Sequence, residues 1–173
     1  IDMVGGRVKT CLLVETKEAV ECIDDILNLS GVDMIHIGLN DLHLSYKKKF
    51  MFELLVDGTV EYLSEKIRKT GILFGFGGIA RLGKGMLPAE YIIAEHYRLG
   101  SGMAILSRSF CNASTCDNID DVREIFKEGL AEIYKYEDSL VKMPDEFFMK
   151  NKEKVEAIVN EIVKKIIDRT EVY

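Results

Sequence analysis

The chain has 173 residues, of which 47% are hydrophobic and 30% charged, a composition typical of a globular domain with a sizeable core. Its formal net charge of −6 argues against nonspecific binding to nucleic acid and against docking on anionic membranes, because both need an excess of Lys and Arg. No apolar run approaches the roughly 18 residues of a membrane-spanning helix, so we expect neither nucleic acid nor membrane as a partner.

Short apolar runs alternate with amphipathic segments along the first part of the chain. The apolar runs predict strands at residues 8–14, 32–37, 72–76 and 103–106. Apolar residues at helical spacing predict helices at residues 17–29, 58–69 and 88–99, with Thr16 capping the first and Gly100 ending the third. An irregular loop is expected between the second strand and the second helix. Two further helices are expected at residues 119–141 and, after Pro144, to about residue 168.

Strands that alternate with helices in this way predict an α/β fold with a parallel sheet covered by helices. Four such units fit either a small doubly wound domain or half of a (β/α)8 barrel, which normally takes about 250 residues. The first strand is not followed by G-x-G-x-x-G, which weakens the dinucleotide-binding alternative. An isolated half-barrel, in turn, would leave two bare strand edges and an exposed apolar inner face.

The ends of the predicted strands carry the residues that could do chemistry, because ligands of parallel α/β folds gather at the carboxyl ends of strands. The first two strands lead into Glu15 and Asp41, and two carboxylates at neighbouring strand ends suit Mg²⁺, Mn²⁺ or another hard divalent cation. The alternative for Glu15 is a residue that favours the dipole of the following helix. The alternative for Asp41 is a loop-capping residue.

Other candidates lie beside these carboxylates. Gly38 and the backbone after it, and the pair Gly77 and Gly78, could let an anionic substrate approach the main chain closely. Arg108 could grip such a substrate, and a surface salt bridge is its alternative. His43 is the candidate for proton transfer because it follows Asp41 in the expected loop, and a solvated loop histidine is its alternative.

The remaining histidines and the cysteines are expected to be structural. His36 is expected to be packed or outward-facing within the second strand, and His96 to lie on a helix surface. Cys11 is expected to be buried, whereas Cys111 and Cys116 lie in a polar loop where they could pair or bind a metal. The cysteines lack C-x-x-C spacing, and the N-terminus has no signal-peptide pattern. We therefore expect reduced thiols and a cytoplasmic protein.

The segment VKTCLLVETKEAVECIDDIL followed by GVDMIHIGLNDL resembles the HpcH/HpaI aldolase and citrate lyase β-subunit family, over about residues 7–110. The layout looks especially like the aldolase/citrate-lyase-like proteins encoded with polysaccharide biosynthesis genes. The family pattern is an apolar strand ending in E-T, a helix, then G-V-D, a second strand and G-P-x-D-L. Leu39 stands here where the family usually has proline, and His43 where serine is common.

The resemblance implies a (β/α)8 barrel of the phosphoenolpyruvate/pyruvate superfamily, of which residues 1–110 would form the C-terminal half. Residues 111–173 would form a helical extension that packs on the barrel or on a neighbouring subunit, so a homo-oligomer is expected. Glu15 and Asp41 would bind Mg²⁺ or a similar ion that chelates pyruvate, oxaloacetate or an acyl-CoA-linked relative. The backbone amides around Asn40 and Asp41 would receive the substrate carboxylate, with Gly38 and Leu39 also at the substrate site.

By the same resemblance, the chain starts just before the fifth barrel strand. The N-terminal half, with the family's catalytic arginine and proton-handling histidine, would be a missing partner, and this chain would be a carbon–carbon lyase half-site acting on a 2-oxo acid. Two alternatives stay open. The first is a non-catalytic barrel that serves as a scaffold or binding protein. The second is a phosphoenolpyruvate-utilising phosphotransfer barrel, which Asn40 slightly favours because those barrels carry a similar G-T-N-D-L motif.

Overall fold

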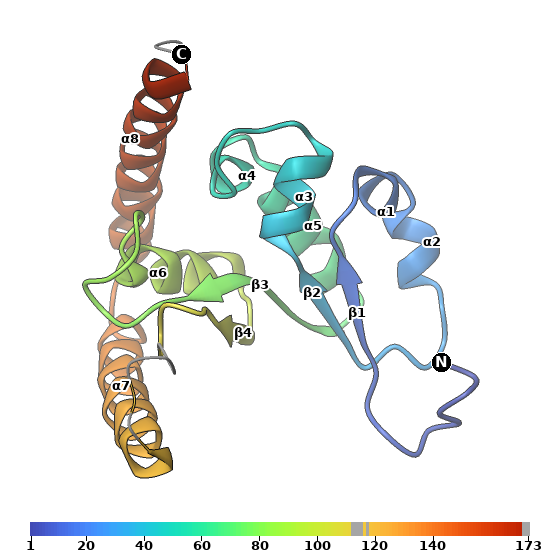
Figure 1. Cartoon of the computed structure of the whole chain (residues 1–173). Helices are drawn as coiled ribbons and strands as arrows, with labels where there is room; N and C mark the ends of the chain where they lie inside the picture. Colours follow the sequence, from blue (N-terminus) through green and yellow to red (C-terminus); the bar gives the residue numbers. More distant parts are fainter. Residues whose placement is uncertain (112–115, 117, 171–173) are drawn as a thin grey trace.

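A computed structural model of the chain describes residues 1–111, 116 and 118–170. It contains one parallel sheet whose strands follow one another in space in their order along the chain (Figure 1). The strands are β1 (Cys11–Val14), β2 (Met34–Ile37), β3 (Leu73–Ile79) and β4 (Met103–Leu106). Consecutive parallel strands joined through helices are consistent with part of an α/β barrel.

Eight helices are assigned within the described residues. They are α1 (Lys17–Glu21), α2 (Ile23–Leu27), α3 (Leu39–Ser45), α4 (Glu53–Val56), α5 (Thr59–Arg68), α6 (Ala89–Leu99), α7 (Ile119–Leu140) and α8 (Asp145–Thr170). The Thr16 side chain caps α1 as predicted, accepting a hydrogen bond from the backbone N–H of Ala19 at 3.2 Å. None of the described helices is both long and apolar enough to cross a membrane.

Several details of the predicted helices and strands are wrong. The helix expected at residues 17–29 is divided into α1 and α2 at Cys22. The expected loop after β2 contains two short helices, and the first of them, α3, forms because Leu39 and Leu42 are both buried three residues apart. The third strand does not stop before Gly77 but runs through it to Ile79.

The two faces of the sheet differ in what covers them. Val14, Ile37 and Phe76 lie in register across three strands, and all are fully buried on the side where α5 and α6 pack. The side chains that alternate with these point to the other face, where Leu13 is 54% exposed and Ile105 51% exposed. Cys11 shares this open face and is exposed, so the prediction that it is buried is wrong.

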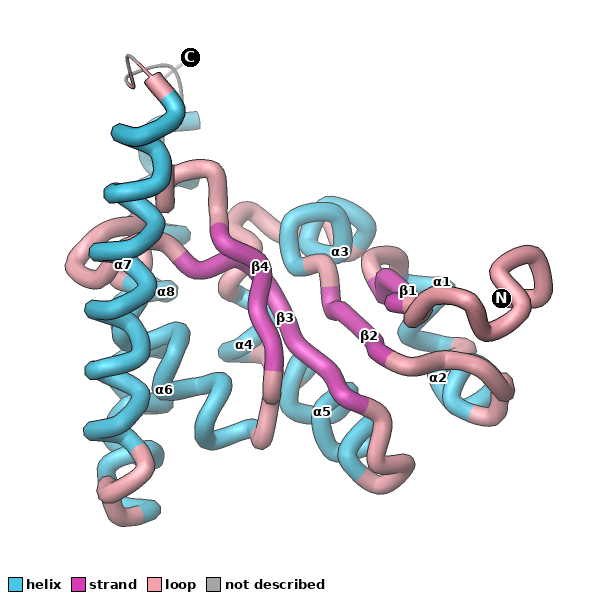
Figure 2. Tube along the Cα trace, turned by 90° about the horizontal axis from the view of Figure 1, so that it is seen from below, coloured by secondary structure: helices cyan, strands magenta, loops and turns pink. Residues whose placement is uncertain are grey.

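The C-terminal helices pack against the helical layer, at α6 and α4, rather than extending the sheet (Figure 2). Helix α8 contacts α6 and α4, and its Val155, Val159 and Ile162 are buried. A buried polar group joins α8 to α6: Glu95 accepts hydrogen bonds from Arg98 at 2.8 Å and from Asn151 of α8 at 2.9 Å. The terminal helices are therefore part of the same packed body.

Candidate functional site

A cavity of about 570 Å³ lies at the carboxyl ends of the strands, on the open face of the sheet. It is lined by every predicted site residue except His43. The full lining is Leu13, Glu15, His36, Gly38, Leu39, Asn40, Asp41, Met51, Gly77, Gly78, Ile105, Ser107, Arg108 and Ser109. The structure thus brings together residues that lie more than 90 positions apart in the sequence.

The two carboxylates reach this cavity because their strands end side by side. Val14 pairs with Ile37, and the N–H of Gly38 donates to the carbonyl of Val14 at 3.0 Å. Glu15 therefore follows the end of β1, and Asp41 lies one helical turn beyond the end of β2, in the first turn of α3. Helix α3, not the expected loop, fixes the position of Asp41.

Gly38 makes room for Glu15. A Cβ atom at this position would lie 2.9 Å from Oε2 and 3.0 Å from Cβ of Glu15, closer than non-bonded atoms normally approach. The carboxylate side chain therefore rests against the bare backbone of Gly38. Glycine is therefore required at the start of the GLNDL segment because a larger residue would collide with the side chain of Glu15.

The opposite wall of the cavity comes from β3 and β4. A bulge between Gly75 and Gly78 shifts the register of the two strands, and Gly77 adopts a left-handed conformation with φ 58° that favours glycine. Arg108 follows β4 and is exposed at the cavity. Its guanidinium is thus the positively charged group in the lining of the cavity.

His43 does not reach the cavity. It lies near the C-terminal end of α3, and its Nδ1 is 3.2 Å from the carbonyl oxygen of Leu39 one turn earlier. That arrangement turns part of the ring back onto its own helix. The structure therefore does not bring the predicted proton-transfer residue together with the other site residues.

His36 is a cavity residue that the sequence reasoning treated as structural. Its side chain is 3% exposed, it lines the cavity, and its Nδ1 is buried without a hydrogen-bond partner among the described residues. Burial lowers the pKa of the imidazole, which favours the neutral form. The alternation Met34-Ile35-His36-Ile37 carried a signal, since it places His36 on the face opposite to buried Ile35 and Ile37.

The cavity offers two carboxylates and one guanidinium, and Gly38, Gly77 and Gly78 also line it. No cluster of three or more metal-ligating side chains occurs among the residues that the structure describes. Mg²⁺ does not require one, because it keeps several waters and is commonly held by one or two carboxylates plus substrate oxygens. Glu15 and Asp41 are thus the two carboxylates of the cavity that could hold a divalent cation, with the rest of its coordination supplied by water and a ligand.

The chain matches no model of a protein family, and no curated protein matches it significantly. The cavity and the residues of the E-T and D-L motifs in its lining are therefore the features that bear on function.

Proposed function

We propose that the cavity binds a divalent cation, Mg²⁺ or Mn²⁺, through Glu15 and Asp41, and that the bound ion holds a 2-oxo acid or a related carboxylate. The reaction class is carbon–carbon bond cleavage of the aldolase and citrate lyase type, with this chain contributing the C-terminal half of a (β/α)8 barrel. The observation that carries the proposal is that both carboxylates of the E-T and D-L motifs line one cavity with Arg108.

The side chains of the cavity have separable tasks in this proposal. Arg108 pairs with the carboxylate of the substrate, because a guanidinium matches two carboxylate oxygens. Gly38, Gly77 and Gly78 line the cavity, so their main-chain atoms are expected to contact a flat, anionic molecule bound there. A divalent cation at the two carboxylates would stabilise the negative charge that develops on the keto oxygen as the carbon–carbon bond breaks.

We expect this chain to bind its ligands without catalysing the complete reaction. In the family that the motifs resemble, the arginine and the histidine that complete the reaction come from the first half of the barrel. We expect the present chain to bind metal and a 2-oxo acid analogue without turnover comparable to that of a full barrel. Exchange of pyruvate protons with solvent, followed by NMR, measures this directly, and exchange at full-barrel rates would refute it.

A non-catalytic binding protein is the second candidate. The observation that favours it is the position of His43, which leaves the cavity without the proton-transfer group expected from the sequence. In this alternative the protein has the barrel architecture but no catalytic activity. It predicts that oxalate, a mimic of the pyruvate enolate, has no measurable affinity for the chain even when Mg²⁺ is present.

Isothermal titration of the chain with oxalate, with and without Mg²⁺, distinguishes the two candidates. The proposal predicts binding that requires Mg²⁺ and that falls at least about tenfold in Glu15→Gln and in Asp41→Asn, the range seen when a metal site is disturbed. Glu18→Gln is the matched control, because Glu18 is an exposed carboxylate close to Glu15 in the chain and does not line the cavity. Equal affinity in Glu18→Gln and Glu15→Gln would contradict the assignment.

A further inference from the structure

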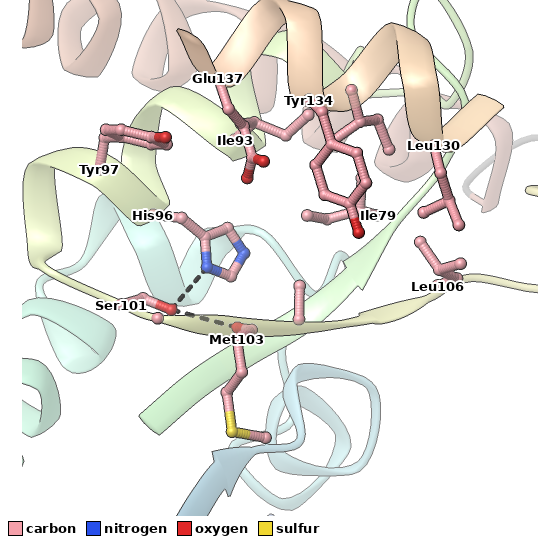
Figure 3. Close-up of a pocket in the computed structure, with 13 residues that line it drawn as sticks. Ile79, Ile93, His96, Tyr97, Ser101, Met103, Leu106, Leu130, Tyr134 and Glu137 are labelled. Atoms are coloured by element: carbon pink, nitrogen blue, oxygen red, sulfur yellow. Dashed lines mark hydrogen bonds between the residues drawn. The ribbon is translucent and has the colours of Figure 1, made fainter. Parts of the chain in front are cut away.

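A second cavity, of about 430 Å³, lies between β4, α6 and α7 (Figure 3). Ile105 lines the first cavity, whereas its neighbours Ala104 and Leu106 line the second. Since successive side chains of a strand point to opposite faces, the two cavities lie on opposite faces of β4. The second cavity is thus separate from the proposed metal site.

Most of the wall of this second cavity is apolar. Its aliphatic part consists of Ile79, Ile93, Leu106, Leu130 and Ile133, contributed by the sheet and both helices. Polar groups are few: His96 and Tyr97 from α6, Ser101, and Tyr134 and Glu137 from α7. A mainly apolar cavity of this size with a small number of polar groups is the usual form of a small-molecule site.

His96 supplies the polar group that is buried deepest. The side chain was expected on a helix surface, but it is only 5% exposed, so that prediction is wrong. Its ring stacks on Phe76, with 3.8 Å between the ring centroids and 2° between the planes, which fixes its orientation. Burial lowers the pKa of His96 to about 3, so the ring is neutral at physiological pH.

The hydrogen bonds around Ser101 favour one of the two neutral tautomers of His96. Oγ of Ser101 lies 2.7 Å from Nδ1 of His96, 3.2 Å from the carbonyl oxygen of Met103 and 3.3 Å from that of Phe74. When Nδ1 of His96 donates to Oγ, the hydroxyl proton of Ser101 can go to a carbonyl oxygen, which only accepts, and every polar atom around Oγ is served. The opposite assignment would leave a buried N–H at Nε2 without an acceptor, so the tautomer with a lone pair on Nε2 is the favoured one.

Nε2 of His96 is a buried acceptor with no partner among the described residues. Figure 3 shows it on the side of the ring away from Ser101, facing the cavity. An unpaired buried acceptor costs free energy that a ligand donor recovers. A single water is a poor substitute, because a buried water needs about three polar partners and the neighbouring wall is aliphatic.

We propose that this cavity binds a small, uncharged apolar molecule that carries one N–H or O–H donor, and that the donor group bonds to Nε2 of His96. Glu137 at the wall adds a second acceptor and disfavours anionic ligands. The site would serve a ligand of a different chemical class from the anionic substrate proposed for the metal site, and it stands independently of that proposal.

The probe for this site is indole, an apolar bicycle with one N–H. The chain contains no tryptophan, so indole fluorescence is observed against a background from tyrosine alone. We expect saturable binding of indole with a blue-shifted emission. Indene has the same ring size and no N–H, and it should displace indole with about threefold to tenfold weaker affinity, the worth of one neutral hydrogen bond.

Two variants and one control test the position of the site. His96→Phe keeps a ring on Phe76 and should abolish the preference for indole over indene. Ala104→Leu fills the cavity from an exposed position and should weaken indole binding at least about tenfold. Ala131→Leu makes the same change at an exposed position of α7 that does not line the cavity, and it should leave binding unchanged.

Circular dichroism of each variant confirms that the fold is intact before binding is measured. The proposal is overturned if the wild-type chain shows no saturable indole binding, or if indole and indene bind equally well. It is also overturned if folded Ala104→Leu binds indole as the wild type does. Should His96→Phe fail to fold, Ala104→Leu and the comparison of indole with indene still decide the question.

Discussion

The buried carboxylate of Glu95 should be one of the most sensitive positions of the fold. The side chain is 1% exposed and accepts hydrogen bonds from Nε of Arg98 at 2.8 Å and from Nδ2 of Asn151 at 2.9 Å. Arg98 also donates to Glu61 at 2.6 Å, and Lys152 of α8 donates to the other oxygen of Glu61 at 2.7 Å. One carboxylate therefore links α6 to α8 and anchors a chain of ion pairs that reaches α5.

Replacing Glu95 by alanine removes one of two acceptors from the nearly buried guanidinium of Arg98 and from the buried amide of Asn151, which keep Glu61 and the carbonyl of Tyr91. Removing one partner of a buried ion pair typically costs about 3–5 kcal/mol, because the remaining charge stays desolvated. Since Arg98 stays paired with Glu61, we expect Glu95→Ala to lower the free energy of unfolding by about 3 kcal/mol, the lower end of that range. For a chain of this length each kcal/mol corresponds to a decrease in Tm of roughly 2–4 °C.

Urea unfolding followed by far-UV circular dichroism measures the change. Glu124→Ala is the matched control: Glu124 pairs with Lys127 at 3.1 Å, but both side chains are more than half exposed, so the free energy of unfolding should hardly change. A loss in Glu95→Ala below about 1 kcal/mol, or one no larger than in Glu124→Ala, would refute the reasoning that this network is desolvated and structural.

Three further outcomes are expected. Gly75→Ala should prevent normal pairing of β3 with β4, because its Cβ would lie 2.0 Å from the carbonyl oxygen of Met103, and a large drop in Tm measures this. Gly38→Ala should keep the fold but displace Glu15, so oxalate affinity in Mg²⁺ should fall while Tm changes little. The folded-state pKa of His96 is lowered to about 3, so its contribution to stability is lost as pH falls from about 6.5 towards 3. Urea titrations at several pH values measure this loss as a decrease in the free energy of unfolding of up to about 1.4 kcal/mol per pH unit. The His96→Phe variant should lack this contribution, and an equal dependence of the free energy of unfolding on pH in both proteins would contradict the prediction.

The strands and long helices were predictable because each has a strong local signal. The strand at residues 103–106 was predicted with the bounds that the structure shows, and the helix at residues 119–141 with an end one residue later than observed. The helix after β2 was missed because its pattern spans less than two turns and is surrounded by polar residues. Leu39 and Leu42 form it through tertiary burial, which local propensity does not record.

The candidate site was predictable in part for a geometric reason. Once the strands are parallel, their carboxyl ends must share one edge, so Glu15, Asp41 and Arg108 could be brought together from the sequence alone. The histidines could not be placed in this way. Whether His36 and His96 are buried depends on which face of the sheet each approaches and on what packs there.

The cysteines show the same limit. Cys11 lies in an apolar run, yet it is exposed because β1 is an edge strand and its side chain points to the open face. For Cys111 and Cys116 the expectation of reduced thiols stays a prediction. Residues 112–115 between them and residue 117 lie outside the described residues, so the alternative that the two cysteines pair or bind a metal also stays untested.

The central claim is that Glu15 and Asp41 hold one divalent cation that in turn holds the substrate carboxylate. The most direct test is a crystal structure of the chain grown with Mn²⁺ and oxalate, with the ion located by anomalous scattering. We predict one Mn²⁺ in the cavity, bonded to a carboxylate oxygen of Glu15 and of Asp41 at about 2.0–2.3 Å and to oxalate, with Arg108 facing the anion. A cavity that stays free of Mn²⁺ and oxalate, or an ion bound by other residues, would contradict the claim.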